Sequence, residues 1–327
     1  MKILAYEHFT ALGEAAPPAL RREGGAMLRA LTADLWRAGH DVVTVAGSFR
    51  SAARRVDAVW IVAPETAGRL ERLTRAALAA GARVLGSEPA GIRLAASKWR
   101  TAAALRRAGV PVVPTRRLGP LVQRIASGGN GGGLQRDGPG GPGVRWPWSF
   151  PLVAKPDDGV GCDAVRLARG PADLVRRRAP SARGRWVVQP RVRGTPASVA
   201  VLVGPGAAVP LALASQRVLA RRRFTYAGGE VPLRRRDARQ AREVAVRACR
   251  AIPGLAGYVG VDLMLTSEGP LVLEVNPRLT TSYLGLRAAT RANVAAAAIA
   301  ALEGRSPGRL RFTRRVRFDA GGAVADR

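Results

Sequence analysis

Short apolar runs alternate with segments of helical periodicity in the first part of the chain. Strands are predicted by the apolar runs at 2–6, 42–45, 58–62 and 84–85. Helices are predicted over 19–38 and 67–80, where apolar residues recur three and four positions apart and a glycine follows. Strands separated by helices and short loops are typical of a parallel sheet covered on both faces. We therefore expect a first α/β unit over residues 1–92.

The pattern changes after residue 92. Helical spacing predicts helices over 97–108, 234–251 and 288–302. Apolar runs predict paired strands over 186–204 and 209–219, and a hairpin from 258–265 and 271–275. The segment 127–143 is rich in Gly and Pro, and Leu134 is its one apolar residue. It can bury almost nothing, so we expect a flexible surface insertion that the chemistry does not need.

Three polar residues interrupt the apolar strands of the predicted hairpin. Asp262 lies within one strand, and Glu274 and Asn276 lie two positions apart on the other. Period-2 geometry sends Glu274 and Asn276 to the same face, and pairing through the turn at 266–269 would bring Asp262 close to them. Two acids and an amide are oxygen donors of the kind that Mg²⁺ prefers. The alternative is that the acids pair with arginines, which are abundant in this chain.

Lysine is rare enough in this chain to be informative. Of 53 basic residues only Lys2, Lys98 and Lys155 are lysines, which indicates a GC-rich genome. Lys155 ends a predicted strand and is followed by a glycine-bearing loop, whose backbone N–H groups could surround phosphates. Lys98 opens a predicted helix. An apolar strand also ends at Gln189, in a pattern that an adenine-binding hinge or an ordinary strand end would share.

The formal net charge of +30 raises the question of a polyanionic partner. Such a charge attracts nucleic acid at low salt, but the arginines are spread over almost every segment and have few aromatic neighbours. We therefore expect no specific nucleic-acid partner. A basic, nucleic-acid-associated binding protein with a degenerate nucleotide fold stays open as an alternative.

Composition also bears on location. Hydrophobic residues make up 47% of the chain, which is a globular balance, and no apolar run approaches the roughly 20 residues of a membrane span. The first residues lack the apolar core of a signal peptide. Cys162 and Cys249 are too few for a disulfide framework. These features favour a cytoplasmic protein with no membrane partner.

In their order and spacing, three segments resemble the ATP-grasp superfamily of carboxylate–amine ligases. They are the strand and loop at Lys155, the strand that ends at Gln189, and the hairpin that carries Asp262 and Glu274. The resemblance covers about residues 93–303, and Glu-Val-Asn-Pro-Arg at 274–278 matches the terminal motif of that family closely. It implies an α/β fold with an N-terminal Rossmann-like pre-ATP-grasp domain at 1–92. Two α+β subdomains that grip ATP would follow, a small one at 93–188 and a large one at 189–327 with the metal site.

The same resemblance assigns roles to individual residues. The implied ATP contacts are Lys98, Lys155, Asp158, Gly159, Gly161 and, near the adenine, Gln189, where many members have Glu. The implied ligands of Mg²⁺, or of Mn²⁺, are Asp262, Glu274 and Asn276. Lys155 and Arg278 would act on the transferring group and the acyl phosphate. Arg217 is either the site of a substrate carboxylate or a plain surface arginine.

A narrower likeness suggests the substrates. The stretches at 2–8, 20–27, 194–198, 216–217, 224–232 and 280–285 resemble tyramine–glutamate ligases of methanofuran biosynthesis. The resemblance implies a ligase of one-carbon metabolism that joins glutamate to tyramine or tyrosine through an acyl phosphate and releases ADP and phosphate. Another amino acid pair is the alternative. Ser198 and Glu230 are both open as the general base, and the oligomeric state is open, with a homodimer as one option.

Overall fold

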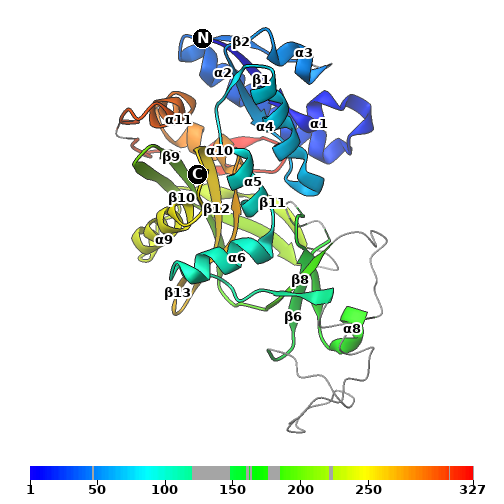
Figure 1. Ribbon diagram of the computed structural model, residues 1–327. Helices are drawn as coiled ribbons and strands as arrows, with labels where there is room; N and C mark the ends of the chain where they lie inside the picture. The colour runs from blue at the N-terminus through cyan, green and yellow to red at the C-terminus, as the bar shows by residue number, and fades with distance from the viewer. Residues whose placement is uncertain are drawn as a thin grey trace.

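Three β-sheets organise the chain. The computed structural model describes residues 1–45, 48–119, 148–159, 162, 164–175, 185–220, 224–308 and 310–326. The sheets have strand orders β2-β1-β3-β4, β13-β12-β9-β10-β11-β14-β15 and β5-β8-β6-β7. Figure 1 shows the first of them at one end of the molecule, the third at the opposite end and the large sheet between them. The predicted insertion at 127–143 lies outside the described residues.

The first sheet is parallel, as the alternation of strands and helices predicts. Its strands are β1 (Lys2–Glu7), β2 (Asp41–Val43), β3 (Ala58–Val62) and β4 (Arg83–Val84). Because side chains alternate along a strand, β1 contributes to two cores. Ile3 and Ala5 pack with residues of α2 (Pro18–Arg37), whereas Leu4 and Tyr6 pack with residues of α3 (Phe49–Ala53) and α4 (Arg69–Ala79). Both faces are therefore covered.

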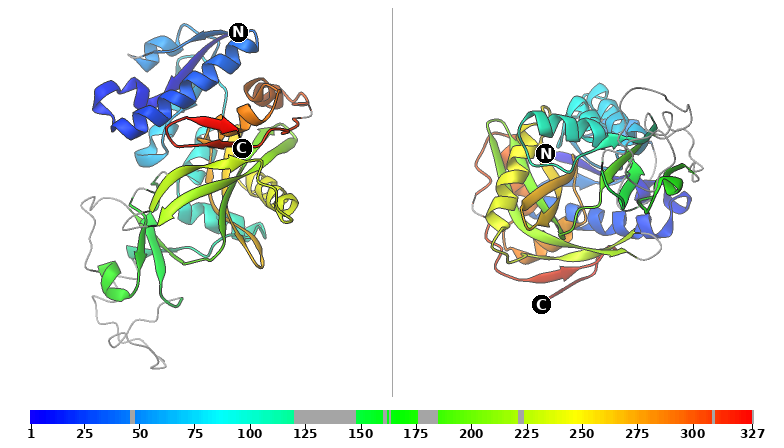
Figure 2. Two further views of the ribbon diagram at one scale, coloured as in Figure 1. Left: turned by 180° about the vertical axis from the view of Figure 1, so that it is seen from behind. Right: turned by 90° about the horizontal axis from the view of Figure 1, so that it is seen from below.

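The large sheet is antiparallel. Its strands are β9 (Thr195–Gly204), β10 (Ala207–Ala220), β11 (Phe224–Val231), β12 (Gly257–Thr266), β13 (Gly269–Asn276), β14 (Val316–Phe318) and β15 (Val324–Asp326). One face packs against α9 (Ala238–Arg250), and the other packs against α10 (Ser282–Ala289), α11 (Val294–Leu302) and α2 of the first unit. Figure 2 shows α2 running along the N-terminal sheet beside the large sheet.

The third sheet is small and antiparallel. It consists of β5 (Arg116–Arg117), β6 (Leu152–Pro156), β7 (Arg166–Ala168) and β8 (Trp186–Pro190). Helices α5 (Pro89–Ala95) and α6 (Lys98–Arg107) precede it, and α8 (Pro171–Val175) follows β7. The boundary expected between residues 188 and 189 falls inside β8, and the division of the chain into three domains stays a prediction.

The remaining elements are short. They are α1 (His8–Ala11) and the 3₁₀ turns η1 (Gly13–Ala15) and η2 (Thr66–Gly68). Among the described helices, the sequence predicts none at the short α1, α3 and α8, and it also misses α5 and most of α10. The helix predicted over 288–302 begins only at Val294, because the Asn293 side chain accepts a hydrogen bond from the Ala296 N–H and caps it.

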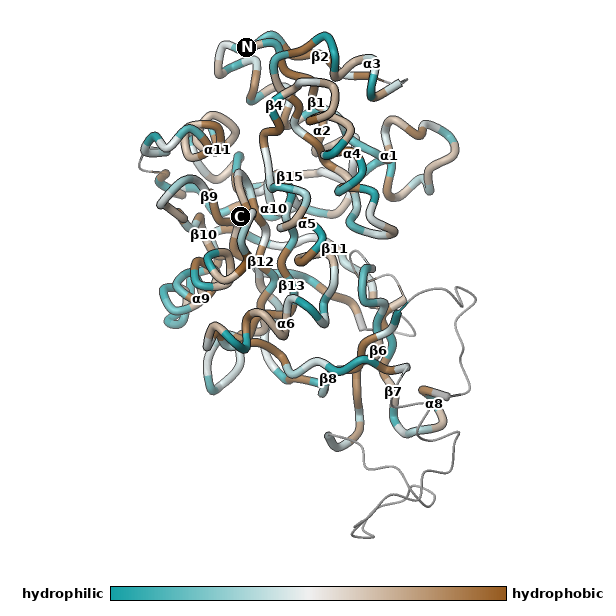
Figure 3. The backbone as a smooth tube through the Cα atoms, in the orientation of Figure 1, coloured by the Kyte–Doolittle hydropathy of each residue, from teal (hydrophilic) through white to brown (hydrophobic). Residues whose placement is uncertain are grey.

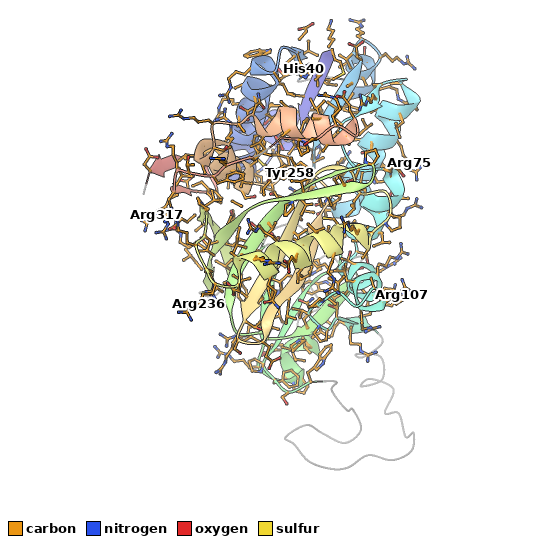
Figure 4. All side chains as sticks on the ribbon, turned by 90° about the vertical axis from the view of Figure 1, so that its left-hand side faces the viewer. His40, Arg75, Arg107, Arg236, Tyr258 and Arg317 are labelled. Atoms are coloured by element: carbon orange, nitrogen blue, oxygen red, sulfur yellow. The ribbon has the colours of Figure 1, made fainter. Side chains whose placement is uncertain are left out.

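Hydropathy and charge are distributed as in an ordinary globular protein. The tube in Figure 3 is brown along the central strands and teal along much of α9. In Figure 4 the labelled Arg75, Arg107, Arg236 and Arg317 project outward from different sides, whereas Tyr258 lies inside. None of the described helices has the length and apolarity that crossing a membrane would require.

Candidate functional site

A cavity of about 520 Å³ opens where the three sheets meet. The large sheet contributes Ser198, Gln216, Asp262, Glu274 and Asn276 to its wall. The small sheet contributes Lys155 and Gln189, and the N-terminal unit contributes Glu7 and Glu23. Several of the residues that the sequence singles out on separate strands therefore share one cavity with residues of the first unit.

The hairpin of β12 and β13 brings together the three predicted metal ligands. Asp262 pairs in register with Glu274, and Gly260 pairs with Asn276. The Asn276 amide donates a hydrogen bond of 3.1 Å to the Asp262 carboxylate. Gln216 of β10 donates another, of 2.7 Å, to the second carboxylate oxygen. The convergence expected from strand periodicity is confirmed.

The two carboxyl groups of this cluster have opposite pKa shifts. Burial, followed by the nearby Glu274 carboxylate, raises the pKa of Asp262 to about 8. Burial also opposes ionisation of Glu274, but the positive charges of Lys98 and Lys155 outweigh it and lower the pKa of that carboxyl. Two carboxyl groups this close cannot both ionise cheaply without added positive charge.

Two of the three lysines lie beside these acids. Lys98 opens α6, and its ammonium lies 3.3 Å from the Glu274 carboxylate. It also donates a hydrogen bond to the carbonyl of Gly159. Lys155, on β6, is 8% exposed, and burial lowers its pKa to about 8, with Glu274 opposing the shift and Lys98 adding to it. The chain therefore concentrates rare compact cations at the acidic cluster.

The acidic cluster fits a hard divalent cation. No group of three or more His, Cys, Asp or Glu residues suited to a metal occurs among the described residues. The donors at the hairpin are two carboxylates and, because the Asn276 nitrogen is the donor to Asp262, the Asn276 carbonyl oxygen. An all-oxygen set with few protein ligands suits a cation that keeps water or phosphate oxygens in its other positions. The metal itself stays a prediction.

The loop after β6 is anchored on both sides. Asp157 accepts hydrogen bonds of 2.7 Å from the Ser97 hydroxyl and 2.9 Å from the Trp99 N–H, which join the loop to the start of α6. The Asp158 carboxylate accepts a 2.9 Å hydrogen bond from the N–H of Ala67 in the first unit. Asp158 is thus bound to protein, and the structure does not bring its side chain to the cavity wall. Gly161 lies outside the described residues.

Gln189 and Arg278 occupy the cavity wall with partners of their own. The Gln189 amide is 4% exposed and donates a 2.8 Å hydrogen bond to the Thr115 hydroxyl. Arg278 donates hydrogen bonds of 2.9 and 3.2 Å to the two carboxylate oxygens of Glu65. Burial opposes the charge of Arg278, but Glu65 outweighs it and raises the pKa of the guanidinium.

The structure does not bring Arg217 to the cavity. Its neighbours Gln216 and Val218 line the wall, whereas the Arg217 side chain is exposed and donates a 3.0 Å hydrogen bond to the Ala227 carbonyl. Side chains alternate along β10, so the residue between two inward-facing ones faces the other way. This placement favours the surface reading of Arg217.

The two candidate bases differ in position. Ser198 is 5% exposed and lines the cavity. Glu230 is bound by Arg315, with Arg317 3.9 Å away, and is not part of the cavity wall. Cys162 lines the cavity, and burial raises the pKa of its thiol to about 11, which disfavours a thiolate nucleophile.

Sequence reasoning missed several residues of the cavity. Glu7 and Glu23 come from the N-terminal unit, and Glu65 positions Arg278 from the same unit. Gln216 belongs to a stretch that resembles the ligases, but no local pattern marks it as a hydrogen-bond partner of Asp262. The available signal for Glu7 was its position at the carboxyl end of a parallel strand, the edge at which α/β sheets place functional residues.

Sequence comparisons assign most of the chain to described families. The profile of the family described as ATP-grasp domain matches residues 95–282, and that of the pre ATP-grasp 3 domain matches residues 30–92. The tyramine–L-glutamate ligases of Methanocaldococcus jannaschii and Methanocaldococcus fervens are 34% and 36% identical to the chain over 102 residues. These alignments cover 31% of this chain and 32% and 33% of the relatives, so the similarity spans about a third of their length.

Structural comparison gives matches over nearly the whole chain. A protein from Archaeoglobus fulgidus described as belonging to the ATP-grasp superfamily is 26% identical, with a TM-score of 0.72 over 97% of this chain and 92% of its own. The L-amino acid ligase of Bacillus licheniformis has a TM-score of 0.69 over 96% of this chain and 78% of its own. At 15% identity, the second match shows the fold alone.

Proposed function

The chain belongs to the ATP-grasp family, and we propose that it is an ATP-dependent, ADP-forming ligase that joins a carboxylate to an amine. The observation that carries the proposal is the acidic hairpin faced by two lysines. Asp262 and Glu274 lie opposite each other on paired strands, and Lys98 lies 3.3 Å from Glu274. Oxygen ligands beside compact ammonium groups are what binding of a metal–nucleotide complex requires.

The reaction has two steps. An oxygen of the substrate carboxylate attacks the γ-phosphorus of ATP, the bond to the β-phosphate oxygen breaks, and an acyl phosphate and ADP form. The amine nitrogen, after losing a proton, then attacks the acyl carbon and phosphate leaves. The protein forms no covalent bond in this scheme, so its contribution is to position the reactants and to offset charge.

Named residues supply that contribution. Bound Mg²⁺, held by Asp262, Glu274 and Asn276, would offset the charge of the ATP phosphates. Lys98 and Lys155 add two ammonium groups at the same place, and the Gly159 carbonyl orients Lys98. Arg278, oriented by Glu65, offers a guanidinium to the transferring group or the acyl phosphate.

For the substrates we propose glutamate and tyramine or tyrosine, in biosynthesis of a methanofuran-type cofactor. The support is the identity of 34–36% with tyramine–L-glutamate ligases over 102 residues. An ATP-grasp ligase for another amino acid pair is the second candidate, supported by the fold of the L-amino acid ligase. The outward, scattered arginines in Figure 4 give no support to a nucleic-acid site.

The test is a measurement of ADP release by the purified protein with ATP, Mg²⁺, glutamate and a set of amines. We expect release that depends on both glutamate and tyramine or tyrosine, with a product whose mass equals the two substrates less one water. ADP release with a different pair would replace the substrates and keep the ligase. No release with any acid and amine, from a folded protein that binds ATP, would refute the ligase.

A further inference from the structure

One end of the cavity has a chemistry that ATP does not explain. Besides the strands that carry Lys155 and Gln189, its wall includes residues of β1, the segment after it and α2 of the N-terminal unit. Two carboxylates, Glu7 and Glu23, lie there among the apolar side chains of Phe9, Leu20 and Met27. Carboxylates repel phosphate oxygens, so this part of the wall suits a group of positive charge.

Neither carboxylate is neutralised by a basic side chain in the part of the chain that the structure describes. Glu7 is 3% exposed and accepts hydrogen bonds from the Phe9 and Thr10 N–H groups, at 3.1 and 2.6 Å, and from the Thr10 hydroxyl. Glu23 accepts one from the Thr281 hydroxyl. All of these donors are uncharged. Arg278, whose charge acts on Glu23 from a distance, is bound to Glu65.

The acids also act on each other. Burial raises the pKa of Glu23, the nearby Glu7 carboxylate adds to the shift, and Thr281 and Arg278 oppose it. A buried carboxyl group and a half-buried one without a bound cationic partner destabilise each other, and a cation placed between them would remove that penalty. The arrangement costs the folded chain stability unless a ligand supplies the charge.

The sequence keeps room for this arrangement at Gly24. That glycine lies inside the 20-residue helix α2, where a glycine costs about 1 kcal/mol relative to alanine. A Cβ at this position would overlap the carboxyl group of Glu7. The helix therefore gives up intrinsic stability at the one position that lets the Glu7 carboxylate lie against it, beside Glu23.

We propose that Glu7 and Glu23 bind the protonated amino group of the amine substrate, while Phe9, Leu20 and Met27 enclose its hydrocarbon part. The substrate class is a primary amine on a short apolar or aromatic body. The inference rests on the proposed function for the statement that an amine is a substrate. The amino group would then lie in the same cavity as the Asp262–Glu274 cluster, beside which the acyl phosphate is proposed to form.

Direct binding tests the inference separately from the ligase reaction. The full chain is titrated calorimetrically with tyramine, 2-phenylethylamine and 4-(2-hydroxyethyl)phenol, with and without a non-hydrolysable ATP analogue and Mg²⁺. The third compound is tyramine with a hydroxyl in place of the amine. We expect both amines to bind and the alcohol to bind at least about tenfold more weakly, because it offers no charge to the acids.

Variants locate the binding. Glu23→Gln and Glu7→Gln should each weaken tyramine at least tenfold and leave the affinity for the ATP analogue within twofold. Glu14→Gln, an exposed acid in the same unit, is the matched control and should bind like the wild type. Gly24→Ala should weaken tyramine with both acids still present, because it displaces Glu7.

Three results would overturn the inference. One is equal affinity for tyramine and the alcohol, the second is unchanged tyramine affinity in both Glu variants, and the third is no binding of either amine under any condition. If the ligase assay fails but the amines bind in this charge-dependent way, the site stands and the proposed function falls. If the assay succeeds and the Glu variants raise the Michaelis constant for glutamate instead of tyramine, the ligase stands and this inference falls.

Discussion

Glu65 and Arg278, which are 213 positions apart in the sequence, form a bidentate ion pair between the N-terminal unit and the ATP-grasp unit. The arginine Nε and Nη2 lie 2.9 and 3.2 Å from the two carboxylate oxygens, and both side chains are largely buried, at 14% and 6% exposure. Glu65 follows the last residues of β3, and Arg278 follows β13. The N-terminal unit therefore orients a guanidinium that belongs to the terminal motif of the ATP-grasp unit.

Glu65→Gln should lower both stability and turnover. The variant removes the carboxylate that is hydrogen-bonded to the buried Arg278 guanidinium, which costs on the order of 3 kcal/mol for a buried pair. Glutamine also offers the guanidinium one acceptor oxygen in place of two. We therefore expect kcat to fall at least about tenfold, with little change in the affinity for ATP. Urea unfolding and steady-state kinetics measure the two effects.

The control is Glu303→Gln. Glu303 pairs with Arg83 at 3.2 Å, but these side chains are 25% and 43% exposed, so the loss should be about 1 kcal/mol or less. Equal losses in the two variants would mean that burial of the Glu65–Arg278 pair has no consequence. A normal kcat in Glu65→Gln would remove Arg278 orientation from the mechanism.

Glu274→Ala should lower turnover by orders of magnitude. The change removes a predicted metal ligand and leaves the Lys98 ammonium, 3.3 Å away, without its partner. We expect the variant to stay folded by circular dichroism and to show a strongly weakened dependence of ADP release on Mg²⁺. Glu268→Ala, in the exposed turn of the same hairpin, should behave like the wild type. Wild-type activity in Glu274→Ala would exclude this carboxylate as a ligand.

Lys155→Arg should be poorly active although it keeps the positive charge. Lys155 is buried beside Lys98 and Glu274, and the planar guanidinium is larger than an ammonium and carries its donors in a different geometry. We expect kcat/KM for ATP to fall at least about tenfold. Lys2→Arg, at an exposed position on β1, serves as the control. An active Lys155→Arg enzyme would show that the rare lysine has no special role.

Local patterns predicted the elements whose residues lie close together in the sequence. The period-2 spacing of Glu274 and Asn276 placed them on one face, and the short turn brought Asp262 opposite them. The parallel N-terminal sheet also followed from alternating strands and helices. Such predictions succeed because hairpin pairing and strand alternation depend on a few neighbouring residues.

The missed features depend on contacts between distant segments. Helix α10 is buried against the N-terminal helix α2 and the large sheet, so its apolar residues face several partners and show no clean helical stripe. Glu7 and Glu23 belong to stretches that resemble the ligases, but no local pattern gives them or Glu65 a role until the first unit packs over the cavity. Arg217 lies in a stretch that resembles the ligases, yet its side chain faces away from the cavity and donates a hydrogen bond to the Ala227 carbonyl.

Asp34 should make the stability of the fold sensitive to acid. It lies on α2, is fully buried and accepts hydrogen bonds of 3.0 and 2.9 Å from Arg287 of α10, with Tyr283 also donating to it. Burial opposes its ionisation, but Arg287 and Tyr283 outweigh burial and lower the pKa of Asp34 below its usual 3.8. The carboxylate thus joins the N-terminal unit to the ATP-grasp unit.

Because the pKa of Asp34 is lowered in the folded protein, acid should reduce the free energy of unfolding. A group whose folded-state pKa is depressed stabilises the protein above its unfolded pKa, and this contribution is lost as the pH falls through the folded-state value. At neutral pH the free energy of unfolding of the wild type should therefore exceed that of Asp34→Asn by about 3 kcal/mol, because the variant leaves Arg287 without a countercharge. Below about pH 4 the difference should shrink as the wild-type carboxylate takes up a proton.

Urea unfolding of both proteins from neutral pH down to about pH 2 measures this difference. The control is Asp326→Asn, which removes an exposed pair with Arg314 and should change stability by less than about 1 kcal/mol. A difference between wild type and Asp34→Asn that stays constant down to about pH 2 would mean that the pKa of Asp34 is the same in the folded and the unfolded protein.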